Sequence, residues 1–148
     1  MLGPIEGKGC TMASIIREIL VDAEPADVWE ALRDFGGVQE RLVPGFVVDT
    51  VLDGPDNRVL TFFNGVVVRE VLVGVDDEAQ RIAYTVADGP LPTTHHHASA
   101  QVVADGPGRS RFVWITDVLP EHAGPAIGEL MDRGIGVIKQ TLESRTRH

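Results

Sequence analysis

Apolar and polar residues alternate through the middle of the chain with a period of two, which is the pattern of a β-strand with one buried face. The first such segment, residues 14–22, is rich in β-branched side chains. Six more segments follow, at residues 46–52, 58–63, 66–75, 81–87, 94–104 and 110–119. Asp, Asn, Gly and Pro occupy the short connections, and Asn64-Gly65 is the strongest hairpin signal, so we predict an antiparallel meander.

Apolar residues at helical spacing lie on both sides of this meander. Pro25 suits the first turn of a helix, and the apolar positions after it predict a helix to about Phe35. A second short helix, residues 38–43, precedes Pro44-Gly45. Residues 121–144 form one long amphipathic helix whose stripe is Ile127, Leu130, Met131, Gly134, Ile135, Ile138 and Leu142.

The order of elements is therefore strand, two short helices, six strands and a long helix. A sheet with one apolar face must bury that face, and only the terminal helix is long enough to cover it. We predict an α+β fold in which a curved antiparallel sheet of about seven strands wraps round the C-terminal helix. Residues 14–148 are expected to form this single domain, and residues 1–13 a disordered N-terminal extension.

The composition narrows the classes of partner. The chain has a formal charge of −9 and only 13 Lys and Arg residues, which are scattered along it. Such a surface repels phosphate backbones and anionic headgroups, so we expect neither nucleic-acid binding nor stable membrane association. The single cysteine, Cys10, cannot form a disulfide within the chain, and we expect a cytoplasmic protein.

Several segments in this order and spacing resemble the START-like (SRPBCC) superfamily, and within it the polyketide cyclase/dehydrase group. The resemblance covers about residues 14–144 and rests on residues 21–32 with Asp34-Phe-Gly36, Pro44-Gly45, 70–78, Tyr84 with 89–92, and 111–114. It implies the helix-grip fold and an apolar cavity between sheet and helix. It implies no cofactor and no metal.

Plant abscisic-acid receptors of this superfamily give a register for the pocket. Their pocket glutamate falls on Glu70, their pocket tyrosine on His96, and their mobile latch loop on residues 89–92. Their gate loop is reduced to the tight turn at Asn64-Gly65, so we do not expect a hormone-operated gate and latch in this chain.

Strand alternation assigns one face of the sheet to the cavity. Small residues on that face, such as Ala98 and Ala100, leave space where a filled core would carry Leu or Ile. With the resemblance, this predicts the ligand contacts Glu70, Leu72, Tyr84, His96, Ala98, Ala100, Trp114, Met131 and Gly134.

Glu70 lies between Val68 and Leu72 on an apolar strand face, where a carboxylate must be paired, hydrogen-bonded or protonated. It either anchors a ligand hydroxyl, acts as a general acid or base, or faces water if the register is slipped. His95 and His97 are expected to be solvated, whereas His96 faces inward as a polar anchor or proton shuttle.

Two functions remain open. The favoured one is binding of a small hydrophobic molecule, such as a lipid, a polyketide or an isoprenoid-like compound. The alternative is an aromatase, cyclase or dehydratase that uses Glu70, His96 or Tyr84 in general acid–base catalysis. Val113 and Ile115 are expected to be exposed on the outer face, either as a dimer patch or as ordinary strand residues, so a monomer and a weak homodimer are the two expected states.

Overall fold

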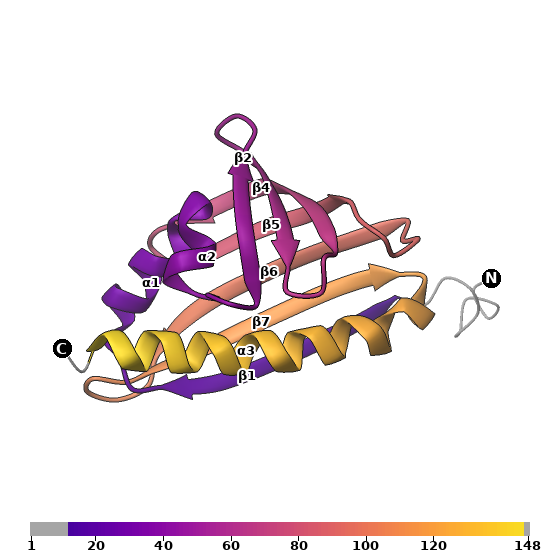
Figure 1. The fold of residues 1–148 in the computed structure, drawn as a ribbon. Coiled ribbons are helices and arrows are strands. Elements are labelled where there is room, and N and C mark those ends of the chain that lie inside the picture. The colour runs from indigo at the N-terminus through magenta and orange to yellow at the C-terminus, as the bar shows by residue number, and fades with distance from the viewer. Residues whose placement is uncertain (1–11, 147–148) are drawn as a thin grey trace, which may run out of the picture.

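One seven-stranded antiparallel sheet dominates the computed structural model, which describes residues 12–146 (Figure 1). The strand order is β1-β7-β6-β5-β4-β3-β2. The strands are β1 (Ala13–Val21), β2 (Val47–Leu52), β3 (Asn57–Phe62), β4 (Val67–Asp76), β5 (Arg81–Asp88), β6 (His95–Ala104) and β7 (Ser110–Leu119). The helices are α1 (Pro25–Arg33), η2 (Phe35–Gly37), α2 (Val38–Arg41), η3 (Glu121–Ala123) and α3 (Gly124–Thr146).

The predicted α+β helix-grip fold is confirmed. The expectation of a disordered extension falls mainly on residues 1–11, which lie outside the described residues, and Ala13 is already part of β1.

The β3–β4 hairpin fixes the register that matters most for the cavity. Gly65 has a φ of +86°, a conformation that side-chain-bearing residues adopt only with strain, and Asn64 Oδ1 accepts a hydrogen bond of 3.2 Å from the Val66 amide. This turn places Arg58 directly opposite Glu70 in the ladder. Two charged residues that are 12 positions apart therefore become cross-strand neighbours.

Helix α1 closes one end of the sheet. Its buried face carries Val28, Trp29 and Leu32. The Trp29 indole donates a 3.0 Å hydrogen bond to Asp77 in the β4–β5 turn, and Arg33 donates a 2.8 Å bond to the same oxygen. The hydrogen bond from Arg33, followed by that from Trp29, lowers the pKa of Asp77.

Helix α3 runs along β1 across the sheet (Figure 1). Lys139 Nζ donates a 2.7 Å hydrogen bond to the Leu20 carbonyl oxygen, which ties the helix to β1. The buried stripe consists of Ile127, Met131, Ile135, Ile138 and Leu142. The spacing of these residues is that of one helical face, as the sequence predicts.

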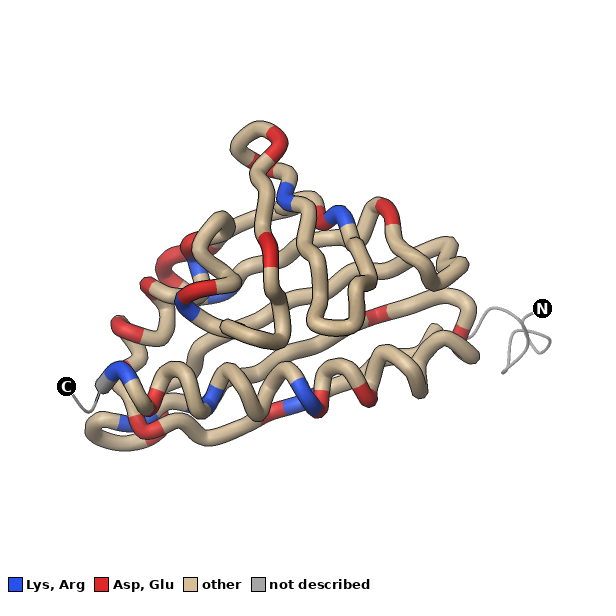
Figure 2. Tube along the Cα trace, in the orientation of Figure 1, with Lys and Arg blue, Asp and Glu red and all other residues tan. Residues whose placement is uncertain are grey.

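Charged residues are spread along the trace rather than gathered in a basic patch, among the residues drawn in Figure 2. No helix within residues 12–146 is both long enough and apolar enough to cross a membrane.

Val113 and Ile115 are half-buried, so the expectation that they are exposed is wrong. Their cross-strand neighbours on β1, Glu18 and Ile16, lie directly opposite them.

Candidate functional site

A cavity of about 400 Å³ lies between the inner face of the sheet and helix α3. Exposed lining residues mark its mouth: Asn64 in the β3–β4 turn, Asp88 at the end of β5, Gly89 in the β5–β6 loop, and Ala126 on α3. The other lining residues are mostly buried. The cavity is therefore a pocket with one rim built from two loops and a helix.

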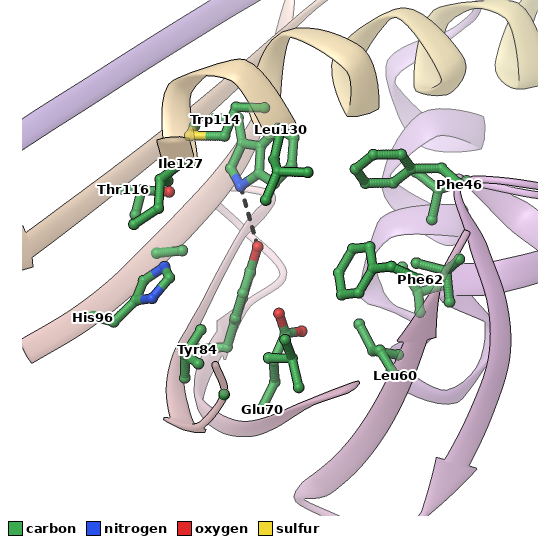
Figure 3. A pocket seen from close by; sticks show the side chains of 18 of the residues that line it. Phe46, Leu60, Phe62, Glu70, Tyr84, His96, Trp114, Thr116, Ile127 and Leu130 are labelled. Atoms are coloured by element: carbon green, nitrogen blue, oxygen red, sulfur yellow. Dashed lines mark hydrogen bonds between the residues drawn. The ribbon is translucent and has the colours of Figure 1, made fainter. Parts of the chain in front are cut away.

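The wall of this pocket is mainly aliphatic and aromatic, and side chains from the strands and from α3 face each other across it (Figure 3). Ala98 and Ala100 on β6 line it, as predicted from their small size. Larger apolar side chains complete the wall, among them Leu32, Phe46, Leu60, Phe62, Ile82, Phe112, Ile127, Leu130 and Met131. A wall of this kind favours an apolar ligand, because water leaves both surfaces on binding.

A buried ion pair, Arg58–Glu70, is the main polar feature of the cavity wall. Arg58 is 5% exposed and Glu70 7% exposed. Arg58 Nε lies 2.8 Å and its Nη2 2.7 Å from the same oxygen, Glu70 Oε1, while Nη1 donates a 3.0 Å hydrogen bond to the Phe35 carbonyl. The guanidinium also lies 3.9 Å from the centre of the Phe35 ring and 5.2 Å from that of Tyr84. These contacts offset much of the cost of burying both charges.

Tyr84 on β5 brings a hydroxyl group into the cavity. The Trp114 indole donates a 3.1 Å hydrogen bond to Tyr84 Oη, as the dashed line in Figure 3 marks. Burial, followed by the negative charge of Glu70, raises the pKa of Tyr84 well above its usual value. The phenol therefore stays protonated at neutral pH, and its own proton is available for an acceptor inside the cavity.

His96 on β6 lines the cavity with a half-buried ring, also visible in Figure 3. Desolvation, followed by repulsion from His95, lowers the pKa of His96 to about 4. The imidazole is thus neutral at physiological pH. It can offer one donor and one acceptor to a ligand, but it is a weak base.

Seven of the nine residues predicted as ligand contacts line the cavity: Glu70, Tyr84, His96, Ala98, Ala100, Trp114 and Met131. Leu72 and Gly134 are not part of the lining. A Cβ atom on Gly134 would lie 3.1 Å from Phe46 and 3.1 Å from Trp114, so aromatic rings fill the space that was assigned to the ligand. Gly134 serves the close approach of helix and rings.

Arg58 is the buried charged residue of the lining that sequence reasoning missed. Its signal lies in the hairpin: pairing the strands about Asn64 puts Arg58 opposite Glu70. Residues 58, 60 and 62 also share one strand face, and Leu60 and Phe62 are apolar. The expectation that Glu70 is on a buried strand face agrees with its position, and the slipped register that would expose it to water is wrong.

Three consecutive histidines, His95-His96-His97, carry side chains that bind metal ions in many proteins. In residues 12–146 no group of three or more His, Cys, Asp or Glu side chains is arranged to hold a metal ion. The His95 and His97 rings are stacked with their centroids 6.2 Å apart, and His95 is exposed.

Comparison with known proteins identifies the family of the chain. A family model described as polyketide cyclase / dehydrase and lipid transport matches residues 12–144. No curated protein matches the sequence.

Solved structures with the same fold include XoxI from Bacillus cereus, with a TM-score of 0.81 at 20% identity over 92% of this chain and 99% of that one. A START superfamily protein from Mycobacterium smegmatis has a TM-score of 0.69 at 16% identity over 89% and 95% of the two chains. Norcoclaurine synthase from Thalictrum flavum, in complex with dopamine and hydroxybenzaldehyde, has a TM-score of 0.70 at 18% identity over 92% and 87%.

Proposed function

The chain belongs to the polyketide cyclase/dehydrase and lipid transport family, and from that premise we propose that it binds a small hydrophobic molecule in the cavity between its sheet and helix α3. The observation that carries the proposal is the pocket of about 400 Å³, whose largely apolar wall holds only a few polar groups. Lipid, polyketide and isoprenoid-like compounds are the candidate classes. The proposal includes a cytoplasmic location and a monomeric or weakly dimeric state.

The size of the cavity limits the ligand. A cavity of about 400 Å³ lies near the lower end of the range of about 300–1,000 Å³ that small-molecule pockets span. One medium-length chain or a compact ring system fits within it. The two acyl chains of a typical membrane lipid exceed this volume, so we do not propose that the cavity encloses an intact diacyl lipid.

A fluorescent hydrophobe tests the proposal directly. We expect N-phenyl-1-naphthylamine, an uncharged probe, to bind the wild-type chain at one site with enhanced fluorescence. Ala100→Phe adds a ring inside the cavity and should weaken binding at least tenfold. Val103→Phe is the matched control, because Val103 is exposed on the opposite face of the same strand.

The paired variants make the outcome decisive. Circular dichroism establishes that both variants are folded. Equal affinity for the probe in folded Ala100→Phe and in wild type would refute binding in this cavity. Equal loss in both variants would also refute it, since Val103 lies outside the cavity lining.

A second candidate function is proton-transfer catalysis on a polyketide-like substrate. It is favoured by Glu70, Tyr84 and His96, which line one cavity, and by norcoclaurine synthase, a protein of similar fold. Three observations favour binding instead. Glu70 is paired with Arg58, burial and Glu70 raise the pKa of Tyr84, and desolvation lowers the pKa of His96 to about 4. The phenol of Tyr84 and the imidazole of His96 are not set to exchange a proton near pH 7, and Glu70 is already engaged by Arg58.

Turnover distinguishes the two functions. Incubation with a poly-β-ketone thioester, followed by mass spectrometry of the products, should give the same products with and without the protein if it is a binding protein. Accelerated cyclisation or dehydration that disappears in both Glu70→Gln and His96→Ala would establish the catalytic alternative.

A further inference from the structure

The two oxygens of the Glu70 carboxylate are used unequally. Both the hydrogen bond from Arg58 Nε and the close ion-pair contact from Nη2 go to Oε1. Within residues 12–146, Glu70 Oε2 has no hydrogen-bond partner. Thr50 Oγ1 is the only fully buried side-chain nitrogen or oxygen of the described residues that lacks a partner, so Oε2 is not fully buried. Oε2 is therefore reachable from the cavity that Glu70 lines, and Figure 3 shows the carboxylate pointing into that space. It is a strong acceptor without a donor.

The charges of the wall oppose an anionic ligand. Among the lining residues that the structure describes, Arg58 is the only Lys or Arg, and its donors are engaged by Glu70 and by the Phe35 carbonyl. Asp88 adds a negative charge at the mouth. A carboxylate or phosphate brought into this cavity would lose its water shell without meeting a free cation.

Neutral donors and acceptors complete the polar part of the wall. Tyr84 has a free hydroxyl proton, because it accepts from Trp114 and donates to no other described residue. Thr116, which is buried, also brings a hydroxyl group to the cavity wall. These groups suit ligand oxygens that are uncharged.

We propose that the cavity selects an uncharged, hydroxyl-bearing amphiphile and discriminates against the corresponding carboxylate, with the ligand hydroxyl donating to Glu70 Oε2. Arg58 acts as the positioning residue: it holds Oε1 and leaves Oε2 directed at the ligand. This inference rests on the proposed binding function and names the chemical class that the site accepts. A site built to receive a hydroxyl proton rejects an analogue without one, because its own polar group then stays unpaired.

Three ligands of matched size test this selectivity by displacement of N-phenyl-1-naphthylamine at neutral pH. They are 1-decanol, its isomer 1-methoxynonane, which has no hydroxyl proton, and decanoate. The ether is the more hydrophobic isomer, so simple partitioning favours it over the alcohol. We expect the wild-type chain to bind 1-decanol at least tenfold more tightly than 1-methoxynonane, and decanoate most weakly.

Two variants assign the preference to the ion pair. Glu70→Gln removes the negative charge and frees Arg58, so decanoate should gain at least tenfold in affinity. The double variant with Arg58→Met and Glu70→Leu leaves an apolar wall, and the ether should then bind at least as tightly as the alcohol. Asp49→Asn, at an exposed position of β2 outside the cavity lining, is the control and should keep the preference for the alcohol.

The outcomes separate this inference from the function on which it rests. Equal binding of the two isomers by the wild-type chain, or tighter binding of decanoate than of 1-decanol, overturns the proposed selectivity and leaves hydrophobic binding in place. A wild-type chain that binds neither the probe nor any of the three ligands overturns both. The wild-type comparison of the isomers decides the question even if Glu70→Gln does not fold.

Discussion

At the scale of single residues, Arg58 is the side chain that links three segments of the chain on one side of the cavity. It is buried, it holds Glu70 through one oxygen, and it binds the carbonyl of Phe35 between two aromatic rings. Through these contacts it joins β3, β4 and the segment after α1 on one side of the cavity. A residue in this position shapes the site even if no ligand touches it.

Arg58→Ala should therefore be strongly destabilising. It leaves the Glu70 charge buried without a partner, and we expect the free energy of unfolding to fall by about 3–5 kcal/mol. Urea denaturation followed by circular dichroism measures this change. The Arg58→Met, Glu70→Leu double variant should recover most of the loss, because it removes both charges and keeps apolar volume.

The matched control for Arg58 is Arg69→Ala on the neighbouring strand. Arg69 pairs with Asp53 at 3.1 Å, and the two side chains are 37% and 69% exposed. The loss should be far smaller there, since water screens an exposed pair. Similar losses in Arg58→Ala and Arg69→Ala would contradict the stated role of the buried pair.

His96 gives a prediction about pH. Its pKa is about 4 in the folded chain and about 6.5 in an unfolded chain. As the pH falls, the unfolded chain binds this proton first, so the stability linked to His96 is complete above about pH 6.5 and is lost towards about pH 4. Allowing for its partial exposure, the loss between about pH 7.5 and pH 5 is about 1 kcal/mol.

Urea denaturation of His96→Gln at those two pH values checks the prediction. The variant should be less sensitive to acid than wild type by about that amount. His122→Gln, at an exposed position in η3, is the control substitution. An equal acid sensitivity of wild type and His96→Gln would show that the burial of this ring has no thermodynamic consequence.

At the scale of the elements, two of the four glycines of helix α3, Gly134 and Gly136, lie in different surroundings. A Cβ on Gly134 would lie 3.1 Å from ring atoms of both Phe46 and Trp114, whereas a Cβ on Gly136 would meet nothing within 4 Å. Phe46 packs against Phe62 and Phe63, and Trp114 is hydrogen-bonded to Tyr84. Neither ring is free to move aside.

Alanine at these two positions should have opposite effects. Gly136→Ala should raise the free energy of unfolding by about 0.5–1 kcal/mol through helix propensity. Gly134→Ala should lower it by about 1 kcal/mol, because overpacking outweighs the same gain. Thermal denaturation of the two single variants is sufficient. Stabilisation by both alanines would mean that the rings adapt and that Gly134 is not needed for close packing.

The elements themselves could be predicted from the sequence because their signals are local. Alternation, turn residues and the long apolar stripe are all short-range patterns, and each strand was found to within about two residues. The end of α1 was placed too late. Asp34 accepts a hydrogen bond from the Gly37 amide and starts the 3-10 turn η2, so the helix ends at Arg33.

The site was less predictable because it depends on distances between elements. Strand alternation could place Glu70, Tyr84 and Ala100 on the cavity face. It could not reveal that Phe46, which follows the α2 segment, reaches Gly134, since that contact depends on how closely helix and sheet approach. The position of Arg58 opposite Glu70 could have been predicted by combining the Asn64-Gly65 turn with the alternation of residues along β3.

At the scale of the whole molecule, the predicted family is confirmed by a family model that spans residues 12–144. The START-like fold is likewise seen in solved structures at low sequence identity. Such a fold serves both binding proteins and enzymes, so the function must be argued from the cavity. A pocket with an ion-paired carboxylate, a protonated phenol and a neutral imidazole is better suited to recognition than to proton transfer.

The most direct test of a ligand-filled cavity is to identify what the protein carries from the cell. Wild-type, Ala100→Phe and Val103→Phe chains are purified in parallel, extracted with organic solvent and analysed by mass spectrometry. The account predicts a compound present at about one per chain in wild type and Val103→Phe and depleted in Ala100→Phe. Indistinguishable extracts from all three proteins, together with no binding of N-phenyl-1-naphthylamine, would contradict it.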